Sequence, residues 1–206
     1  MANVSTMTMA VDSGRPTGTA DRARQRRDFA LQLGLWIFLA TATMLFASFS
    51  SAYIVRQSGT DWQVLTLPSV LWLNTLLLVI SSISIEVARI DARKDKWRAA
   101  GASVLTTALL GIAFVTGQFA AWRDLVAQGV YVPTNPYSAF FYILTGLHVL
   151  HLTAGLMFLL YVAWRIFKRG GGQNDGLLTT LLNLSATFWH FFGALWIYLF
   201  VLLTLF

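Results

Sequence analysis

The chain has no cysteine, and only 12% of its 206 residues are charged. The absence of cysteine excludes disulfide bonds, thiolate catalysis and cysteine-ligated metal. The low charge content excludes an ordinary soluble domain, in which about a quarter of the residues are charged. Because hydrophobic residues make up 56% of the chain, the composition predicts an integral membrane protein.

Apolar segments of membrane-spanning length recur along the chain. A transmembrane helix needs about 20 predominantly apolar residues, and five segments meet this requirement. They are residues 29–55, 68–87, 97–122, 136–166 and 177–206. We therefore predict an all-α, polytopic membrane domain of five helices over residues 29–206. The first 28 residues are polar and contain no secretory signal, which predicts a largely disordered tail.

Basic residues are distributed unevenly over the segments that join these spans. Of the 15 Lys and Arg residues, all but Arg56 and Arg123 lie in the N-terminal tail, the second loop and the fourth loop. The positive-inside rule then places the N-terminus in the cytoplasm and the C-terminus outside. This clustering accounts for the net charge of +6 as a topology signal, with no role in nucleic-acid binding. The glycine-rich fourth loop, residues 169–176, is expected to be a flexible hairpin.

All three histidines lie inside predicted spans, His148 and His151 in the fourth and His190 in the fifth. Ionisable residues within a membrane span are functional hypotheses by default. Three histidines could in principle ligate a transition metal or a haem, but no Asp, Glu or Cys lies near them in sequence as a further ligand. The alternative, which we favour, is hydrogen bonding of neutral histidines between helices.

Polar and small side chains form one stripe on each of the last two spans. Thr145 and His148 belong to the first stripe, and Asn183 and His190 to the second. Because consecutive helices pack antiparallel, we expect the two stripes to meet. Asn183, Thr187 and Gln118 are then interhelical hydrogen-bonding groups, and Trp189, beside His190, is expected to line an internal groove.

Carboxylates are nearly absent from the spans. Glu86 lies three residues before Arg89, and we expect these two side chains to pair at the cytoplasmic membrane interface. No carboxylate is expected at the membrane midplane, so a proton relay within this chain is not predicted.

The fourth span resembles the signature helix of subunit III of haem-copper cytochrome oxidases. Ser138–Leu156 contains FF at Phe140-Phe141, followed by LTGLHVLHLTAG. Other stretches match the family in the same order along residues 33–206. They are Leu39–Arg56, Leu67–Ser82, Gly111–Trp122 (as G-x-x-F-x-x-x-Q…W) and Phe188–Trp196. The chain resembles the short, five-span form of the family, with Ala42, Ala121 and Gly193 at positions that often carry acidic residues.

The resemblance implies a non-catalytic subunit of an aerobic respiratory terminal oxidase. It implies that haem and copper lie in the partner subunits I and II, and that this chain binds no cofactor. It also implies packing on subunit I, phospholipid in a cleft between the first two helices and the remaining three, and support of proton uptake and sustained turnover. Cytochrome c or quinol would be the electron donor. The chain would reside in a bacterial inner membrane, where it could join a larger respiratory supercomplex.

The site residues are accordingly expected to have structural or lipid-facing roles, with none catalytic or metal-binding. They are His148, His151, His190, Trp189, Gln118, Thr145, Asn183 and Arg56. Three alternatives remain open at this point: a subunit III-like protein that accompanies nitric oxide reductase, a haem-binding quinone oxidoreductase subunit, and a transporter. The absence of an internal repeat gives no support to the transporter.

Overall fold

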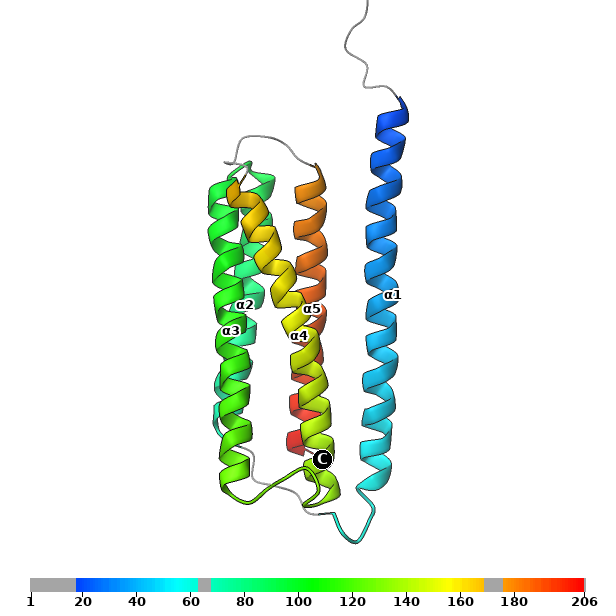
Figure 1. Cartoon of the computed structure of the whole chain (residues 1–206), viewed down its shortest axis with the longest axis vertical. Coiled ribbons are helices and arrows are strands. Elements are labelled where there is room, and N and C mark those ends of the chain that lie inside the picture. The colour runs from blue at the N-terminus through cyan, green and yellow to red at the C-terminus, as the bar shows by residue number, and fades with distance from the viewer. Residues whose placement is uncertain (1–17, 63–67, 169–175, 206) are drawn as a thin grey trace, which may run out of the picture.

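The structure is a computed structural model of the chain, and it describes residues 18–62, 68–168 and 176–205. Five α-helices follow one another in sequence (Figure 1). Each is long and apolar enough to cross a membrane, and the described residues contain no strand. The predicted all-α fold with five spans is therefore confirmed. The helices are α1 (Gly18–Arg56), α2 (Val70–Arg93), α3 (Trp97–Ala127), α4 (Pro136–Lys168) and α5 (Gly176–Leu205).

Helix α1 begins well before the apolar segment that starts at Phe29. The structure thus differs from the expected tail for residues 18–28, which are helical. This stretch is rich in Ala, Arg and Gln, which are good helix formers, and extending an existing helix avoids the cost of nucleation. The rest of the expected tail, residues 1–17, and residues 169–175 of the expected hairpin lie outside the described residues.

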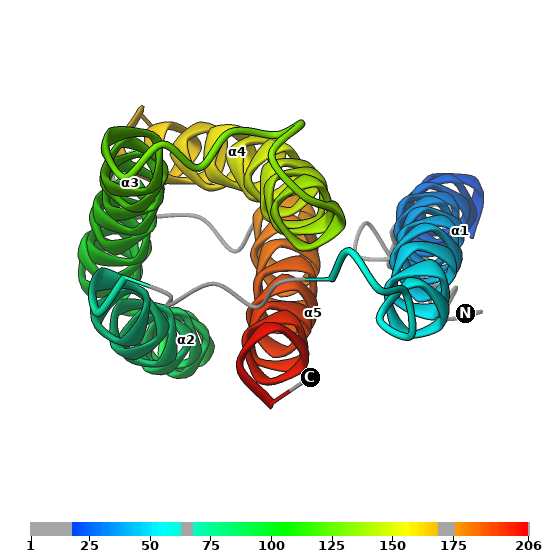
Figure 2. The same cartoon turned by 90° about the horizontal axis from the view of Figure 1, so that it is seen from below.

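Four of the helices form one closed group, and α1 stands beside it (Figure 2). Each helix from α2 to α4 packs on the next, and α5 also packs on α2. Helix α1 packs on α4 and α5 and makes no close backbone approach to α2 or α3 in the described ranges. The expected cleft between the first two helices and the other three is therefore wrong for this chain.

The short connection between α2 and α3 explains why α2 belongs to the four-helix group. Only Lys94, Asp95 and Lys96 separate the two helices, and a connection this short makes consecutive helices antiparallel neighbours. Asp95 has a φ of 57°, a left-handed conformation that Asp tolerates better than most residues other than Gly. This turn fixes α2 along α3 and leaves α1 to pack on the opposite side of α5.

Large aromatic side chains fill the core, and small residues receive them. Trp189, Phe114 and Phe192 are almost completely buried. A Cβ atom built on Gly155 of α4 would overlap the ring of Phe188 from α5. That ring is held between Phe38 and Phe192, with centroid distances of 5.8 Å and 4.6 Å. Gly155 therefore sets how closely α4 and α5 approach.

We predict that Gly155→Ala lowers the stability of the four-helix group by roughly 1–3 kcal/mol, the usual cost of overpacking, because the Phe188 ring cannot move aside freely. Gly146→Ala on the same helix is the control, since a Cβ there meets nothing within 4 Å. Midpoints of unfolding in SDS, measured on the purified chain, would compare the two. Equal midpoints for both variants would contradict this account of the α4–α5 contact.

Candidate functional site

His148 lies in the core of the four-helix group and is 0% exposed. Its ring contacts those of Trp196, Phe114 and Phe192, with centroid distances of 5.2, 5.9 and 6.2 Å. Neither ring nitrogen has a hydrogen-bond partner among the described residues. His148 is therefore held in place by packing against aromatic rings.

His151 lies one turn further along α4, where α1 packs on the group. Its Nδ1 is 2.7 Å from the backbone oxygen of Leu147. Its ring stacks on Phe192 at 5.2 Å and contacts Phe38 and Phe46 of α1 at 5.8 and 5.7 Å. Ala42 is one turn from each of these α1 residues and is 3% exposed. A side chain at position 42 would therefore point towards His151. Ala42, noted above as a position that lacks an acidic residue, is thus a neighbour of His151 on α1.

His190 lies on the side of α5 that faces α2, away from the aromatic residues that contact α4. Its Nε2 is 3.5 Å from Oε2 of Glu86, and the same carboxylate oxygen accepts a hydrogen bond from Nη1 of Arg89 at 2.9 Å. The Nε of Arg89 in turn donates to Oδ1 of Asn183 at 3.1 Å. These four residues, Glu86, Arg89, Asn183 and His190, form a polar cluster that joins α2 to α5; we call it the Glu86 cluster.

The Glu86 cluster lies at membrane depth. His190 is at the middle of α5 (Gly176–Leu205), and its neighbour Trp189 hydrogen-bonds Ser81 at the middle of α2. Glu86 is five residues beyond Ser81, about 7 Å along the helix at 1.5 Å per residue, whereas the hydrocarbon core extends about 15 Å on either side of its centre. The expected pairing of Glu86 with Arg89 is confirmed, and the positions of the helix midpoints favour a place inside the hydrocarbon core over one at its interface.

The three histidines do not converge on one point. His148 and His151 face the aromatic core and α1, whereas His190 faces α2. No group of three or more His, Cys, Asp or Glu side chains that could hold a metal ion occurs in the part of the chain that the structure describes. The geometry therefore supports roles in packing and hydrogen bonding for these three histidines.

The two polar stripes expected to meet do not. Helix α4 contacts α5 through the aromatic residues Phe188, Phe192 and Trp196. The stripe of Asn183 and His190 instead faces α2. The polar stripe and the aromatic residues of α5 lie on different sides of the helix, and the aromatic side packs on α4.

Three tryptophan indoles donate hydrogen bonds between helices of the core, beside the bond from the Tyr137 hydroxyl of α4 to the backbone oxygen of Leu203 in α5. Trp189 is 1% exposed, and its Nε1 donates to Oγ of Ser81 at 2.8 Å. Trp196 donates to Thr75 at 3.0 Å, and Trp122 to Thr145 at 3.1 Å. Thr145 thus links α3 to α4, and Trp189, expected to line a groove, is a buried link between α5 and α2.

Two further polar side chains are buried, Gln118 of α3 and Asn74 of α2. Gln118, a predicted interhelical group, is 0% exposed, and its amide has no hydrogen-bond partner among the described residues. Asn74 is similarly buried, with its amide against Gly117. Thr187 hydrogen-bonds the backbone of its own helix at Asn183. Within the described residues, Asn183 is the one of the three predicted groups that hydrogen-bonds another helix, through Arg89.

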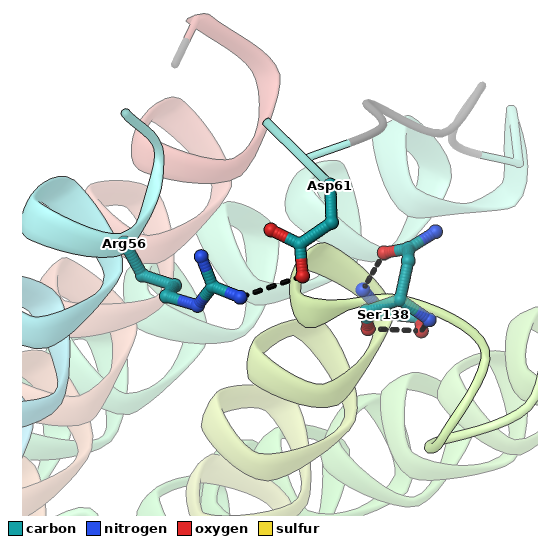
Figure 3. Close-up of polar contacts among 4 residues, drawn as sticks. Arg56, Asp61 and Ser138 are labelled. Atoms are coloured by element: carbon teal, nitrogen blue, oxygen red, sulfur yellow. Dashed lines mark hydrogen bonds and ion pairs between the residues drawn. The ribbon is translucent and has the colours of Figure 1, made fainter. Parts of the chain in front are cut away.

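Arg56 is the last residue of α1. It lies at the end of the helices opposite to the turn that joins α2 to α3 (Figure 1). Its Nη2 is 2.6 Å from Oδ2 of Asp61, and both side chains are exposed (Figure 3). Nearby, Asn135 and Ser138 form a reciprocal cap at the start of α4. The Ser138 N–H donates to Oδ1 of Asn135 at 2.8 Å, and the Ser138 Oγ accepts from the Asn135 N–H at 3.2 Å. Arg56 and residues at the start of α4, Pro136 and Phe140 among them, line a groove of about 740 Å³.

The sequence did not predict the partners of the tryptophans or the contact between Glu86 and His190. Ser81 and Thr75 give no signal in sequence beyond being hydroxyls within an apolar span. The depth of Glu86 depends on how far α2 is shifted along α5, and this register is set by packing. Gly193, noted only as a lost acidic position, proves to line a groove beside Glu86 and His190.

Comparison with known proteins gives consistent matches along nearly the whole chain. The family model described as "Cytochrome c oxidase subunit III" matches residues 17–206. The cytochrome c oxidase subunit 3 of Thermostichus vulcanus is 32% identical, over 90% of this chain and 93% of that protein. The cytochrome bo(3) ubiquinol oxidase subunit 3 of Pseudomonas aeruginosa is 34% identical, over 84% and 83%. The probable cytochrome c oxidase subunit 3 of Mycobacterium tuberculosis is 27% identical, over 96% and 98%.

We predict that a glutamate at position 42 couples energetically to His151. In Ala42→Glu the new carboxylate is buried opposite the imidazole, and hydrogen bonds to charged groups contribute about 1.5–3 kcal/mol. The free energy of unfolding should therefore fall less on Ala42→Glu when His151 is present than in a His151→Leu background. Ala42→Gln in both backgrounds is the uncharged control. A coupling energy of zero for the glutamate would show that the two positions do not face each other.

Proposed function

Because this chain belongs to the cytochrome c oxidase subunit III family, we propose that it is the non-catalytic subunit III of an aerobic haem-copper terminal oxidase. It is an accessory, multi-pass membrane subunit that associates with other oxidase subunits. In our proposal it packs on subunit I of a complex that also contains subunit II. Those partners carry haem and copper and use electrons from cytochrome c or quinol to reduce oxygen. The family match over residues 17–206 carries this conclusion.

The arrangement of the titratable groups is consistent with an accessory role in which the subunit does not itself conduct protons. His148 and His151 pack against aromatic rings, and Glu86 pairs with Arg89 and His190 in a separate place. These groups do not form one chain of hydrogen bonds across the described helices. We propose that the subunit sustains proton uptake and turnover by holding its partner in place, without conducting protons through its own core.

Phospholipid binding is a second part of the proposal, and grooves beside α1 support it. Since α1 packs only on α4 and α5, spaces remain along its sides. One is the groove of about 740 Å³ that Arg56 lines, where a guanidinium could bind a lipid phosphate at the membrane surface. Arg56 is thus the lipid-facing candidate among the predicted site residues.

We also propose that the chain resides in a bacterial inner membrane with its N-terminus in the cytoplasm. The uneven distribution of Lys and Arg supports this orientation, since only Arg56 and Arg123 lie on the proposed outer side. The turn at Lys94 and Asp95 would then face the cytoplasm, and the segment before Pro136 would face outwards.

Purification of the intact complex through a tag on this chain tests the function. We expect a subunit with haem and copper absorption to co-elute, and phospholipid to be retained, whereas this chain separated from its partners should show no Soret band. A Soret band that stays with the isolated chain would contradict the proposal. Co-elution with an iron-centred nitric oxide reductase subunit would replace the oxidase with that partner.

Histidine variants refine this test. We expect His148→Leu and His190→Leu to weaken retention of the subunit or of lipid, while the haem and copper content per catalytic subunit stays unchanged. Loss of haem or copper in either variant would mean that these histidines serve a metal site.

Single-cysteine labelling tests the orientation, and the absence of native cysteine makes it clean. In intact spheroplasts, a membrane-impermeant maleimide should label Thr134→Cys and Ser58→Cys, and should label Asp91→Cys only after lysis. All three positions lie in or near exposed turns. The reverse pattern would invert the proposed topology.

A further inference from the structure

Two grooves lie side by side along α5. The first, of about 520 Å³, lies between α2 and α5 and is lined by Ser82, Glu86, His190, Gly193 and Ala194 among others. The second, of about 310 Å³, lies between α1 and α5 and shares Ala194 with the first. Figure 2 shows α5 between α1 and α2, with no helix covering this side. We call the combined surface the α5 face.

The α5 face presents ionisable groups at membrane depth. The side chains of Glu86 and His190 are 42% and 40% exposed, although both lie within the depth of the hydrocarbon core as derived above. The apolar stretches of α1 and α3 contain no carboxyl or imidazole group, and His148 of α4 is 0% exposed. Such groups are costly against lipid and normally face protein or a wet cavity.

The Glu86 cluster has unused hydrogen-bonding capacity directed at this face. The contacts from Arg89 and His190 both go to Oε2 of Glu86, and Oε1 has no hydrogen bond to any described residue. Arg89 balances the carboxylate charge, so a neutral donor such as a hydroxyl, amide or indole N–H matches the free oxygen. A lipid acyl chain offers no such donor.

Small residues form the floor of the face beside this cluster. A Cβ atom built on Gly193 would meet only Oγ of Ser82, at 3.4 Å, and Ala194 and Ala47 continue the small surface towards α1. Small residues allow transmembrane helices to approach closely, and close packing with hydrogen bonds is what drives helix association in lipid.

We propose that the α5 face receives a transmembrane helix of another oxidase subunit. That helix packs small side chains on Gly193 and Ala194 and donates a hydrogen bond to Glu86 from a neutral polar residue. This inference rests on the proposed function, because it names the surface through which the accessory subunit would hold its partner. A lipid chain is the competing occupant.

Photo-crosslinking in the assembled complex tests the proposal. A benzophenone amino acid is placed at Ile83 or Ile197, which are 62% and 44% exposed beside the grooves. The matched controls are Leu109 of α3 and Leu150 of α4, which are 57% and 66% exposed. We expect adducts with a co-purifying oxidase subunit from the first pair and lipid adducts from the controls. Lipid adducts from all four positions, or subunit adducts from the controls alone, would overturn the proposal.

A groove-filling variant provides a second readout. We expect Gly193→Leu to reduce the recovery of the partner subunit about tenfold, the scale of an overpacking penalty at a packed contact, without changing the unfolding midpoint of the isolated chain. Gly146→Leu, where the structure leaves open space, is the control. Unchanged recovery for Gly193→Leu overturns the proposal. If the chain fails to co-purify with any oxidase subunit even without substitution, the proposed function itself has failed.

Discussion

Unpaired polar groups are costly inside a bilayer, and the hydrogen bonds between helices set much of the arrangement of this fold. Tryptophan N–H groups donate to hydroxyls on neighbouring helices at Ser81, Thr75 and Thr145. These bonds fix the register of α5 against α2 and of α3 against α4. That register places Glu86 beside His190 at membrane depth. The position of the Glu86 cluster on the outer surface of the subunit therefore follows from the hydrogen bonds of its interior.

The molecule has two different kinds of helix contact. Helices α2 to α5 close on one another around buried aromatic rings, whereas α1 packs on α4 and α5 alone. His151 lies at the junction, between Phe192 of the group and Phe38 and Phe46 of α1. Because α1 covers only one side of α5, the α5 face remains open. The chain thus combines a closed four-helix group with an open side along α5.

The sequence predicted the number of helices, their approximate ends apart from the start of α1, and the family, because these depend on local composition and on co-linear motifs. It also predicted the Glu86–Arg89 pair, which depends only on spacing within one helix. It did not predict which faces of the helices meet. The stripe of Asn183 and His190 turned towards α2 because the aromatic side of α5, with Phe188 and Trp196, packs on α4. Helix rotation and register are properties of packing between segments far apart in sequence, and for that reason the contact between Glu86 and His190 was not predicted.

The central claim is that this chain is a non-catalytic subunit whose open side, centred on Glu86 and His190, holds the rest of the oxidase. An experimentally determined structure of the intact complex tests it most directly. The account predicts a helix of another subunit in contact with Gly193 and the Glu86 cluster, with every haem and copper bound by other chains. Lipid or bulk solvent against Glu86, or an iron or copper ion bound by His148, His151 or His190, would contradict it.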